Sequence, residues 1–354
     1  MSMFRANIEA MTGYVPGEQP PPGKIIKLNT NENPYACSPQ VTRAIERACA
    51  QGLSRYPDPS ATAFRHCAAQ VLGGAHALDI GPEWILCGNG SDDILTIVTR
   101  AFVGEGELVR HPTPSYVLYR TLAEIQGARV EEVPFAPDWT LGSQFAAPAD
   151  DLRLAYLANP NSPSGTMIAP DRVFELADAL PCLLLVDEAY VDFADADCLS
   201  LVARSEKIMV ARTLSKSYAL AGLRFGFLVA QPHVIEQLAK VKDSYNCDAL
   251  SIAGACAAID DQAWRMENRE KIVAARSRLT QAMRELGFDP PDSQANFVWN
   301  PHPELPVQPI YERLKKAGVL VRYMDYPGIG DGLRITVGTD SQIDACLSLL
   351  KTLV

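Results

Sequence analysis

The sequence predicts an α/β protein: a mostly parallel sheet with helices on both faces, followed by a smaller α+β unit. Short apolar runs alternate with helical stretches as far as about residue 230, which is typical of parallel sheets. The run 183–186 is wholly apolar, as expected of a strand covered on both faces. The length of 354 residues also favours two domains. We expect an N-terminal arm at 1–28, a large domain at 29–250 and a small domain at 251–354.

Local signals place the expected helices. Ser38 followed by Pro39 is typical of a helix start, and apolar residues at helical spacing mark the later segments. The helices are expected at about 38–51, 60–72, 94–102, 117–126, 232–245, 250–286 and 308–317. The Asn- and Pro-rich segments 28–35 and 54–59 are expected to be loops.

Short apolar runs bounded by turn residues place the strands. They are expected at about 84–87, 107–110, 129–133, 154–158, 183–186, 208–210 and 225–230 in the large domain, and at 295–299, 319–322 and 333–337 in the small one.

Composition argues against several classes of partner. The net charge is −10 with no basic block, which argues against nucleic acid and anionic membranes. No apolar run approaches the roughly 18 residues of a membrane span, and no signal peptide is visible. The nine cysteines form no C-x-x-C pair, and the five histidines form no H-E-x-x-H motif. We therefore expect reduced thiols, no metal centre and a cytoplasmic location.

Four of the predicted strands are each followed by a residue of a kind common in binding sites. These residues are Gly90, Asn161, Asp187 and Lys216. Ligands of open α/β sheets bind at the carboxyl ends of the strands, so these residues are expected at one edge. The glycine turn 88–93 leads into a helix whose free N–H groups could bind an anion. Taken alone, it would equally suit a plain turn.

Lys216 brings a reactive amine to this edge. Ser215 lies beside it and Arg224 follows shortly after, and both side chains suit a phosphate group. A lysine amine can serve as nucleophile and proton carrier. An amine beside an anion site suits a phosphorylated aldehyde such as pyridoxal phosphate. An isolated Ser-Lys pair would more often belong to a surface loop; the other residues at the edge favour the site.

Several motifs together resemble the fold-type I, class I and II pyridoxal-phosphate-dependent aminotransferases. They are Asn159-Pro-Asn161, Asp187-Glu-Ala-Tyr190, Ser215-Lys216 and Arg224. The segments 28–34, 55–59 and 333–338 are more narrowly similar to histidinol-phosphate aminotransferases. The resemblance runs from about residue 24 to the C-terminus. It implies a large α/β/α domain with a seven-stranded sheet, and an arm that packs with the small domain.

The resemblance implies a role for each residue around the cofactor ring. Lys216 would carry pyridoxal 5'-phosphate covalently and move the substrate proton. Asp187 would pair with the pyridine nitrogen and keep it protonated. Asn161 and Tyr190 would hydrogen-bond the phenolic oxygen, and Tyr116 would stack on the ring.

The resemblance also implies a phosphate site and a shared dimer site. Ser91 and Asp92 would offer backbone N–H groups to the cofactor phosphate, with Ser215 and Arg224 completing the site. Tyr56 would reach that phosphate from the other subunit, which implies a homodimer with shared active sites.

The substrate is implied by a further group of residues. Arg334 and Arg322 would bind its phosphate or carboxylate, with Tyr14 and Asn33 as further contacts. The implied reaction, in histidine biosynthesis, transfers an amino group from histidinol phosphate to 2-oxoglutarate and gives imidazole-acetol phosphate and glutamate. Aromatic amino acids as donors, or decarboxylation of threonine phosphate, are the enzymatic alternatives. A non-enzymatic regulator of this fold is disfavoured because Lys216 is present and no basic DNA-binding segment is visible.

Overall fold

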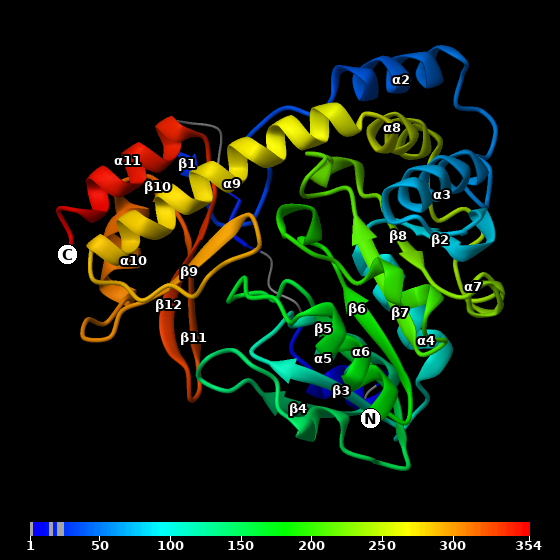
Figure 1. The fold of residues 1–354 in the computed structure, drawn as a ribbon, viewed down its shortest axis with the longest axis horizontal. Helices are drawn as coiled ribbons and strands as arrows, with labels where there is room; N and C mark the ends of the chain where they lie inside the picture. The colour runs from blue at the N-terminus through cyan, green and yellow to red at the C-terminus, as the bar shows by residue number, and fades with distance from the viewer. Residues whose placement is uncertain (1–2, 14–16, 20–24) are drawn as a thin grey trace.

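A seven-stranded sheet lies at the centre of the larger part of the molecule (Figure 1). The structure is a computed structural model that describes residues 3–13, 17–19 and 25–354. The strand order is β2-β8-β7-β6-β5-β3-β4, and all neighbours are parallel except where β8 pairs with β2 and β7. The strands are β2 (Ile85–Gly88), β3 (Leu108–Thr113), β4 (Arg129–Pro134), β5 (Leu152–Ala158), β6 (Leu183–Asp187), β7 (Ile208–Thr213) and β8 (Gly226–Val229). The mostly parallel sheet predicted from the sequence is confirmed.

Helices cover both faces of this sheet because its strands carry apolar side chains on both. On β6, Leu184 and Val186 belong to one core and Leu185 to the other, as the strand period of two requires. The first core is closed by α2 (Pro39–Ala50), α3 (Thr62–His76), α6 (Pro170–Ala179) and α8 (Ala249–Asp260). The second is closed by α4 (Ser91–Phe102), α5 (Leu118–Gln126) and α7 (Pro232–Leu238). The predicted cap on α2 is confirmed, since Ser38 Oγ accepts a hydrogen bond from the Gln40 N–H.

A smaller unit carries its own sheets and core. Its antiparallel sheet has the order β11-β12-β9, and β1 pairs in parallel with β10 beside it. These strands are β1 (Ile26–Lys27), β9 (Phe297–Pro301), β10 (Val319–Leu320), β11 (Arg322–Tyr326) and β12 (Gly330–Thr336). The helices α10 (Gln308–Lys316) and α11 (Asp340–Leu350) pack on them.

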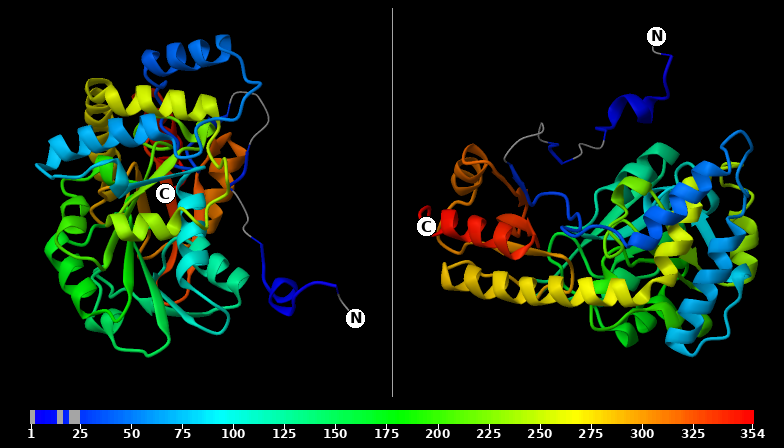
Figure 2. Two further views of the ribbon diagram at one scale, coloured as in Figure 1. Left: turned by 90° about the vertical axis from the view of Figure 1, so that its right-hand side faces the viewer. Right: turned by 90° about the horizontal axis from the view of Figure 1, so that it is seen from above.

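One long helix, α9 (Gln262–Glu285), joins the two units, and Figures 1 and 2 show it running along both. Its C-terminal residues Leu279 and Met283 lie in the core of the smaller unit. The preceding α8 instead buries Ile252 and Ala255 in the core of the larger one. We therefore propose that the domain boundary lies inside α9 and not at residue 250.

The described parts of the N-terminal segment contact both units. The short helix α1 (Ala6–Ala10) lies against α5, where the Asn7 amide donates to the carbonyl of Glu124 at 2.7 Å. Farther along, the carbonyl of Glu18 accepts from Asn29, and its carboxylate pairs with Lys315 at 2.6 Å. Among the described residues, Glu18 thus contacts α10 of the small unit, and the packing of the whole arm with the small domain stays a prediction. Tyr14 lies outside the described residues.

The described part of the chain shows neither a membrane-spanning helix nor a metal-binding cluster. None of its helices is long and apolar enough to cross a bilayer. Within the same residues, no group of three or more His, Cys, Asp or Glu side chains is placed to hold a metal ion.

Candidate active site

A pocket lies where the carboxyl edge of the large sheet faces the small unit. Side chains from both units line it. Ten of the residues singled out in the sequence are among them: Ser91, Asp92, Tyr116, Asp187, Tyr190, Ser215, Lys216, Arg224, Arg322 and Arg334. The sequence placed Gly90, Asn161, Asp187 and Lys216 at one edge of the large sheet. Of these, Asp187 and Lys216 line the pocket and Gly90 directly precedes the lining residue Ser91, whereas Asn161 does not line it. Arg322 and Arg334 come from the sheet of the small unit.

Asp187 ends β6 and presents a buried carboxylate to the pocket. Its Oδ2 accepts a hydrogen bond from the Tyr119 hydroxyl at 2.8 Å, and its Oδ1 accepts from the Ala189 N–H at 3.1 Å. Burial raises the pKa of Asp187 to about 6, against the opposing effect of these two hydrogen bonds and of Lys216. A cation placed in the pocket would therefore stabilise the ionised form of this carboxylate.

Lys216 follows β7, and its loop is fixed by side chains from other parts of the chain. The Asn33 amide donates to the carbonyls of Lys216 and Ser217, each at 3.1 Å. The Lys216 Nζ lies 5.6 Å from the centre of the Tyr190 ring. The backbone is thus held while the amine itself faces the pocket.

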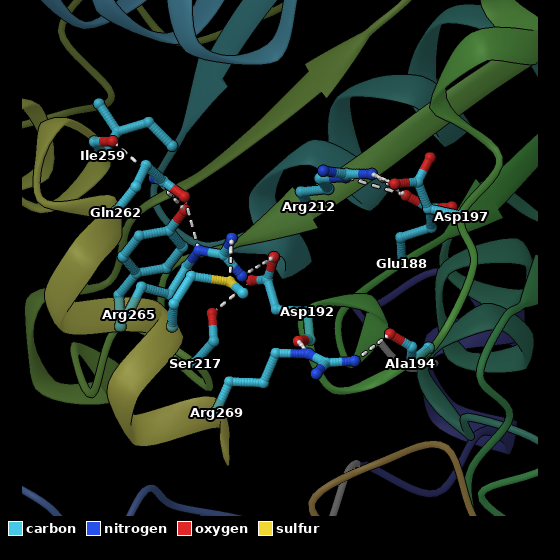
Figure 3. A network of polar contacts seen from close by, with 12 residues as sticks. Glu188, Asp192, Ala194, Asp197, Arg212, Ser217, Ile259, Gln262, Arg265 and Arg269 are labelled. Atoms are coloured by element: carbon cyan, nitrogen blue, oxygen red, sulfur yellow. Dashed lines mark hydrogen bonds and ion pairs between the residues drawn. The ribbon is translucent and has the colours of Figure 1, made fainter. Parts of the chain in front are cut away.

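A polar network ties this loop to the long helix α9 (Figure 3). Asp192, just after Tyr190, accepts a hydrogen bond from Ser217 and lies 3.4 Å from Arg265 of α9. Arg269, one turn later, donates to the carbonyls of Asp192 and Ala194 at 2.9 and 2.7 Å. The turns after β6 and β7 are therefore anchored to the helix that joins the two units.

A buried ion pair lies directly behind Asp187. Arg212 contacts the Glu188 carboxylate through Nε at 2.9 Å and Nη2 at 2.8 Å, and its Nη2 lies 3.2 Å from Asp197. Glu188 also accepts from the Cys198 N–H. Burial disfavours the charge of Arg212, but the carboxylates around Arg212 outweigh this effect and raise the pKa of the guanidinium well above its usual value.

The Glu188→Gln variant is expected to destabilise the fold by about 3–5 kcal/mol, because it removes the main partner of a buried charge. Urea unfolding followed by circular dichroism would measure this loss. The matched control is Asp340→Asn, which breaks an exposed pair with Arg278 and should leave the unfolding midpoint nearly unchanged. Equal midpoint shifts in the two variants would contradict the structural role of Glu188.

The N-terminus of α4 and Arg224 form a site suited to phosphate. Gly90 precedes the helix with φ +85°, and a Cβ there would lie 2.4 Å from Nη2 of Arg224. Arg224 also approaches Ser215 Oγ at 3.3 Å and Asp92 Oδ2 at 3.4 Å. Free N–H groups of a first helical turn, together with a guanidinium and a hydroxyl, make a phosphate site. Glycine at position 90 is what lets Arg224 come this close.

Two tyrosines stand on the walls of the pocket. The Tyr116 hydroxyl donates to Asp92 Oδ1 at 3.1 Å. The Tyr190 hydroxyl accepts from the Asn31 amide at 3.0 Å, and its ring meets Phe297 edge-on. A hydrogen bond at the hydroxyl therefore helps to hold each ring.

Arg322 and Arg334 form the wall contributed by the small unit. They are directly opposite each other on the antiparallel strands β11 and β12, so both side chains lie on one face. Arg334 donates to Ser162 Oγ at 2.8 Å and to the Asn29 carbonyl at 3.3 Å. The pocket thus has two cationic regions, one at Arg224 and one at this pair.

Two residues predicted to contact a ligand, Asn161 and Asn33, make their hydrogen bonds to the protein instead. The Asn161 amide donates to the Pro114 carbonyl and to Ser164, and its oxygen accepts from Ser115. Asn33 gives both amide hydrogens to the Lys216 loop. Neither residue lines the pocket. Their predicted ligand contacts stay predictions, and this hydrogen bonding does not favour them.

Tyr56 lies elsewhere on the surface. It is 80% exposed and stacks on Tyr245 at 4.4 Å. It does not line the pocket of its own chain. This position is compatible with the prediction that it reaches another subunit.

Other residues of the site were not found from the sequence. The pocket is also lined by Asn31, Ser162, Met324 and Tyr326. Met324 and Tyr326 follow Arg322 at the strand period of two, a signal that could have identified them. Asn31 and Ser162 lie in loops, where spacing gives no comparable signal.

Comparisons with known proteins decide the family. The model of the aminotransferase class I and II family matches residues 23–350. The chain belongs to this family. It is therefore a pyridoxal-phosphate-dependent aminotransferase, and the fold-type I architecture is confirmed.

Several relatives are similar over their whole length. The chain is 57% identical to a histidinol-phosphate aminotransferase of Rhodopirellula baltica, covering 98% of this chain and 95% of the relative. It is 45% identical to histidinol-phosphate aminotransferase 1 of Trichormus variabilis, covering 99% of each. A solved histidinol-phosphate aminotransferase of Sinorhizobium meliloti, in complex with pyridoxal 5'-phosphate, has a TM-score of 0.86 at 26% identity and covers 100% and 99% of the two chains.

The residues of the aminotransferase pocket fit this cofactor. The site at Gly90 and Arg224 suits its phosphate, and Asp187 has a carboxylate that could accept from the ring nitrogen. Lys216 faces the same space, and Tyr116 offers a flat ring on the wall. The phosphate, the ring nitrogen, the aldehyde and the face of the ring in pyridoxal phosphate therefore each have a suitable side chain in or beside this pocket.

Proposed function

We propose that the chain transfers the amino group of histidinol phosphate to 2-oxoglutarate, giving imidazole-acetol phosphate and glutamate, a step of histidine biosynthesis. The names of the relatives over nearly the full length support this reaction. The geometry that favours it is the pair Arg322 and Arg334, which the small unit contributes to the pocket, whereas the cofactor-phosphate site belongs to the large unit. A second strongly cationic region suits a donor that carries its own phosphate.

Bound pyridoxal phosphate would supply an electron sink for the substrate carbanion. Lys216 would hold the cofactor and then act as base and acid for the proton of the substrate's α-carbon. Asp187 would hold a proton on the ring nitrogen. Tyr190, kept in place by Asn31, would hydrogen-bond the phenolic oxygen.

The arginine pair would serve both halves of the reaction. Histidinol phosphate has no α-carboxylate, so Arg322 and Arg334 would bind its phosphate. In the second half they would bind a carboxylate of 2-oxoglutarate, because a guanidinium fork matches either anion. One binding region can therefore accept both substrates in turn.

We also infer a cytoplasmic homodimer with shared active sites. Tyr56 and Tyr245 form an exposed stacked pair, at 80% and 46% exposure. Exposed aromatic pairs are typical of protein interfaces. Tyr56 would contact the cofactor phosphate of the partner subunit.

A panel of amino donors tests the proposed reaction. Histidinol phosphate, phenylalanine, tyrosine and threonine phosphate would each be assayed with 2-oxoglutarate, and glutamate formation would be measured. We expect kcat/KM to be highest for histidinol phosphate. A preference for phenylalanine or tyrosine would assign an aromatic aminotransferase instead, and release of carbon dioxide from threonine phosphate would assign a decarboxylase.

Ser162→Ala is expected to raise KM for histidinol phosphate roughly tenfold with little change in kcat, because a hydrogen bond to a charged group is lost. The hydroxyl of Ser162 accepts a hydrogen bond from Nη1 of Arg334. The control is Ser164→Ala in the same loop, whose hydroxyl contacts Asn161 and Thr166. An equal rise in KM for Ser164→Ala would contradict a specific role for Ser162.

A further inference from the structure

A buried tyrosine reaches Asp187 from the helix that follows β3. Tyr119 lies in the first turn of α5, is fully buried, and donates its hydroxyl to Asp187 Oδ2 at 2.8 Å. We propose that Tyr119 is a positioning residue that holds the Asp187 carboxylate ionised and aimed at the ring nitrogen of bound pyridoxal phosphate. The inference rests on the proposed function, since that function gives Asp187 the ring nitrogen as its partner.

The hydrogen bonds to Asp187 fix the orientation of its carboxylate. Tyr119 binds Oδ2, and the Ala189 N–H binds Oδ1 at 3.1 Å. A carboxylate has about four lone-pair sites, so each oxygen can still accept another donor. Asp187 lines the pocket, and the remaining sites can serve a donor there. The carboxylate is therefore held in place before a ligand arrives.

Three aromatic side chains pack against the Tyr119 ring. Tyr156 stacks on it with ring centres 4.6 Å apart and planes 5° apart, and Tyr116 meets it edge-on at 5.7 Å. His111 contacts it at 5.8 Å. Tyr156 is itself fixed, because its hydroxyl lies 2.5 Å from Thr99 Oγ1. A ring packed on three sides cannot turn its hydroxyl away from Asp187.

The charges around Asp187 make the Tyr119 hydroxyl important. Burial, and then the negative charge of Asp187, raise the pKa of Tyr119 well above its usual value, so it keeps its proton and acts as a donor. Burial and Asp92 disfavour ionisation of Asp187, whereas Tyr119, Ala189 and Lys216 favour it. Tyr156 stays neutral because burial raises its pKa.

Removing the hydroxyl should therefore make the Asp187 carboxylate a stronger base. A hydrogen bond to the charged form of an acid lowers its pKa, and a phenylalanine in place of Tyr119 has no hydroxyl with which to make one. Asp187 would then compete more strongly for the proton it shares with the ring nitrogen. The shared proton would therefore lie more on Asp187, and the ring nitrogen would be less protonated over the pH range in which the pair holds one proton.

Tyr119→Phe tests this in the full-length protein loaded with pyridoxal phosphate carrying 15N in its ring. The chemical shift of the ring nitrogen would be followed from pH 5 to 9. Over the range in which the pair holds one proton, we expect the chemical shift to move toward the value of an unprotonated pyridine nitrogen relative to the unmodified protein. No amino donor is present, so this result does not depend on which substrate the enzyme uses.

Tyr156→Phe is the matched control, because it removes a buried hydroxyl from the same stack without touching Asp187. It should leave the titration of the ring nitrogen unchanged. The proposal is overturned if Tyr119→Phe titrates like the unmodified protein, or if Tyr156→Phe shows the same shift. Near-ultraviolet circular dichroism would show whether the aromatic stack is retained, and Tyr119→His, which restores a donor, should reverse part of the shift.

Discussion

Lys216→Ala is expected to lower the rate of transamination by about 10³-fold or more. One general acid–base group alone contributes about 10²–10⁴-fold. The variant loses both the amine that holds the cofactor and the group that moves the substrate proton. The substitution should not disturb the loop itself. Asn33 holds the loop through its backbone carbonyls and Asp192 holds it through Ser217. None of these contacts uses the Lys216 side chain, so they remain in the Lys216→Ala variant. Glutamate formation from histidinol phosphate and 2-oxoglutarate would measure the loss.

A chemical experiment identifies the lysine independently of turnover. Borohydride reduction of the loaded protein, followed by peptide mass spectrometry, should place the cofactor on Lys216. Lys242→Ala is the control, because Lys242 contacts the carbonyls of Asp243 and Ser244 away from the pocket. Full turnover by Lys216→Ala, or labelling of another lysine in the unmodified protein, would refute the assignment.

Asp187→Asn is expected to lower kcat by about 10²–10³-fold, the range for removing one preorganised electrostatic group. Asparagine keeps the shape of the side chain and can still accept from Ala189, but it carries no charge to hold a proton on the ring nitrogen. Cofactor affinity should change much less, because Lys216 and the phosphate site remain. Steady-state kinetics and a fluorescence titration with pyridoxal phosphate would separate the two effects.

Stability should change in the opposite direction to activity. The pKa of Asp187 in the folded chain, about 6, is above its usual value of 3.8. The unfolded chain therefore binds fewer protons between these pH values, and stability falls as pH rises through them. The asparagine variant avoids this cost, so without cofactor it should be more stable at pH 8 by roughly 2–3 kcal/mol. A large loss of cofactor affinity with kcat retained would contradict the electronic role of Asp187.

The sequence was sufficient for the sheet and for most of the site because both depend on local patterns. Apolar runs identified each strand of the large sheet, and parallel strands bring their carboxyl ends to one edge. Gly90, Asp187 and Lys216 therefore came together without any knowledge of loop conformation. Strand order alone does not tell whether Asn161 or Ser162 lines the pocket. Ser162 lines it, and this depends on the conformation of the turn in which the Gly165 N–H donates to the Asn161 carbonyl.

Helix ends were predicted less well, for physical reasons. The helix expected at 232–245 ends at Leu238, and beyond it Asn246 is bound to the Cys87 carbonyl and to Asp93. The helix expected at 250–286 is two helices, and Asp261 caps the second. Tertiary contacts and a capping side chain overrode the apolar periodicity in these places.

Besides the short α1 of the N-terminal arm, two helices were not expected at all. The first, α6, begins at Pro170 without a side-chain cap, so its start gives only a proline signal. The second, α11, has a complete capping box between Thr339 and Gln342, a signal that was present in the sequence. The Tyr119–Asp187 contact could not be predicted, because the two residues are far apart in sequence and meet only through the packing of α5 on the sheet.

The most direct test of the central claim is a single half-reaction. The protein loaded with pyridoxal phosphate would be mixed with histidinol phosphate in the absence of 2-oxoglutarate, and imidazole-acetol phosphate would be quantified by mass spectrometry. We expect about one equivalent of this ketone per subunit, followed by a halt that 2-oxoglutarate relieves, as ping-pong transfer requires. No ketone from histidinol phosphate, under conditions in which phenylalanine or threonine phosphate reacts, would contradict the account.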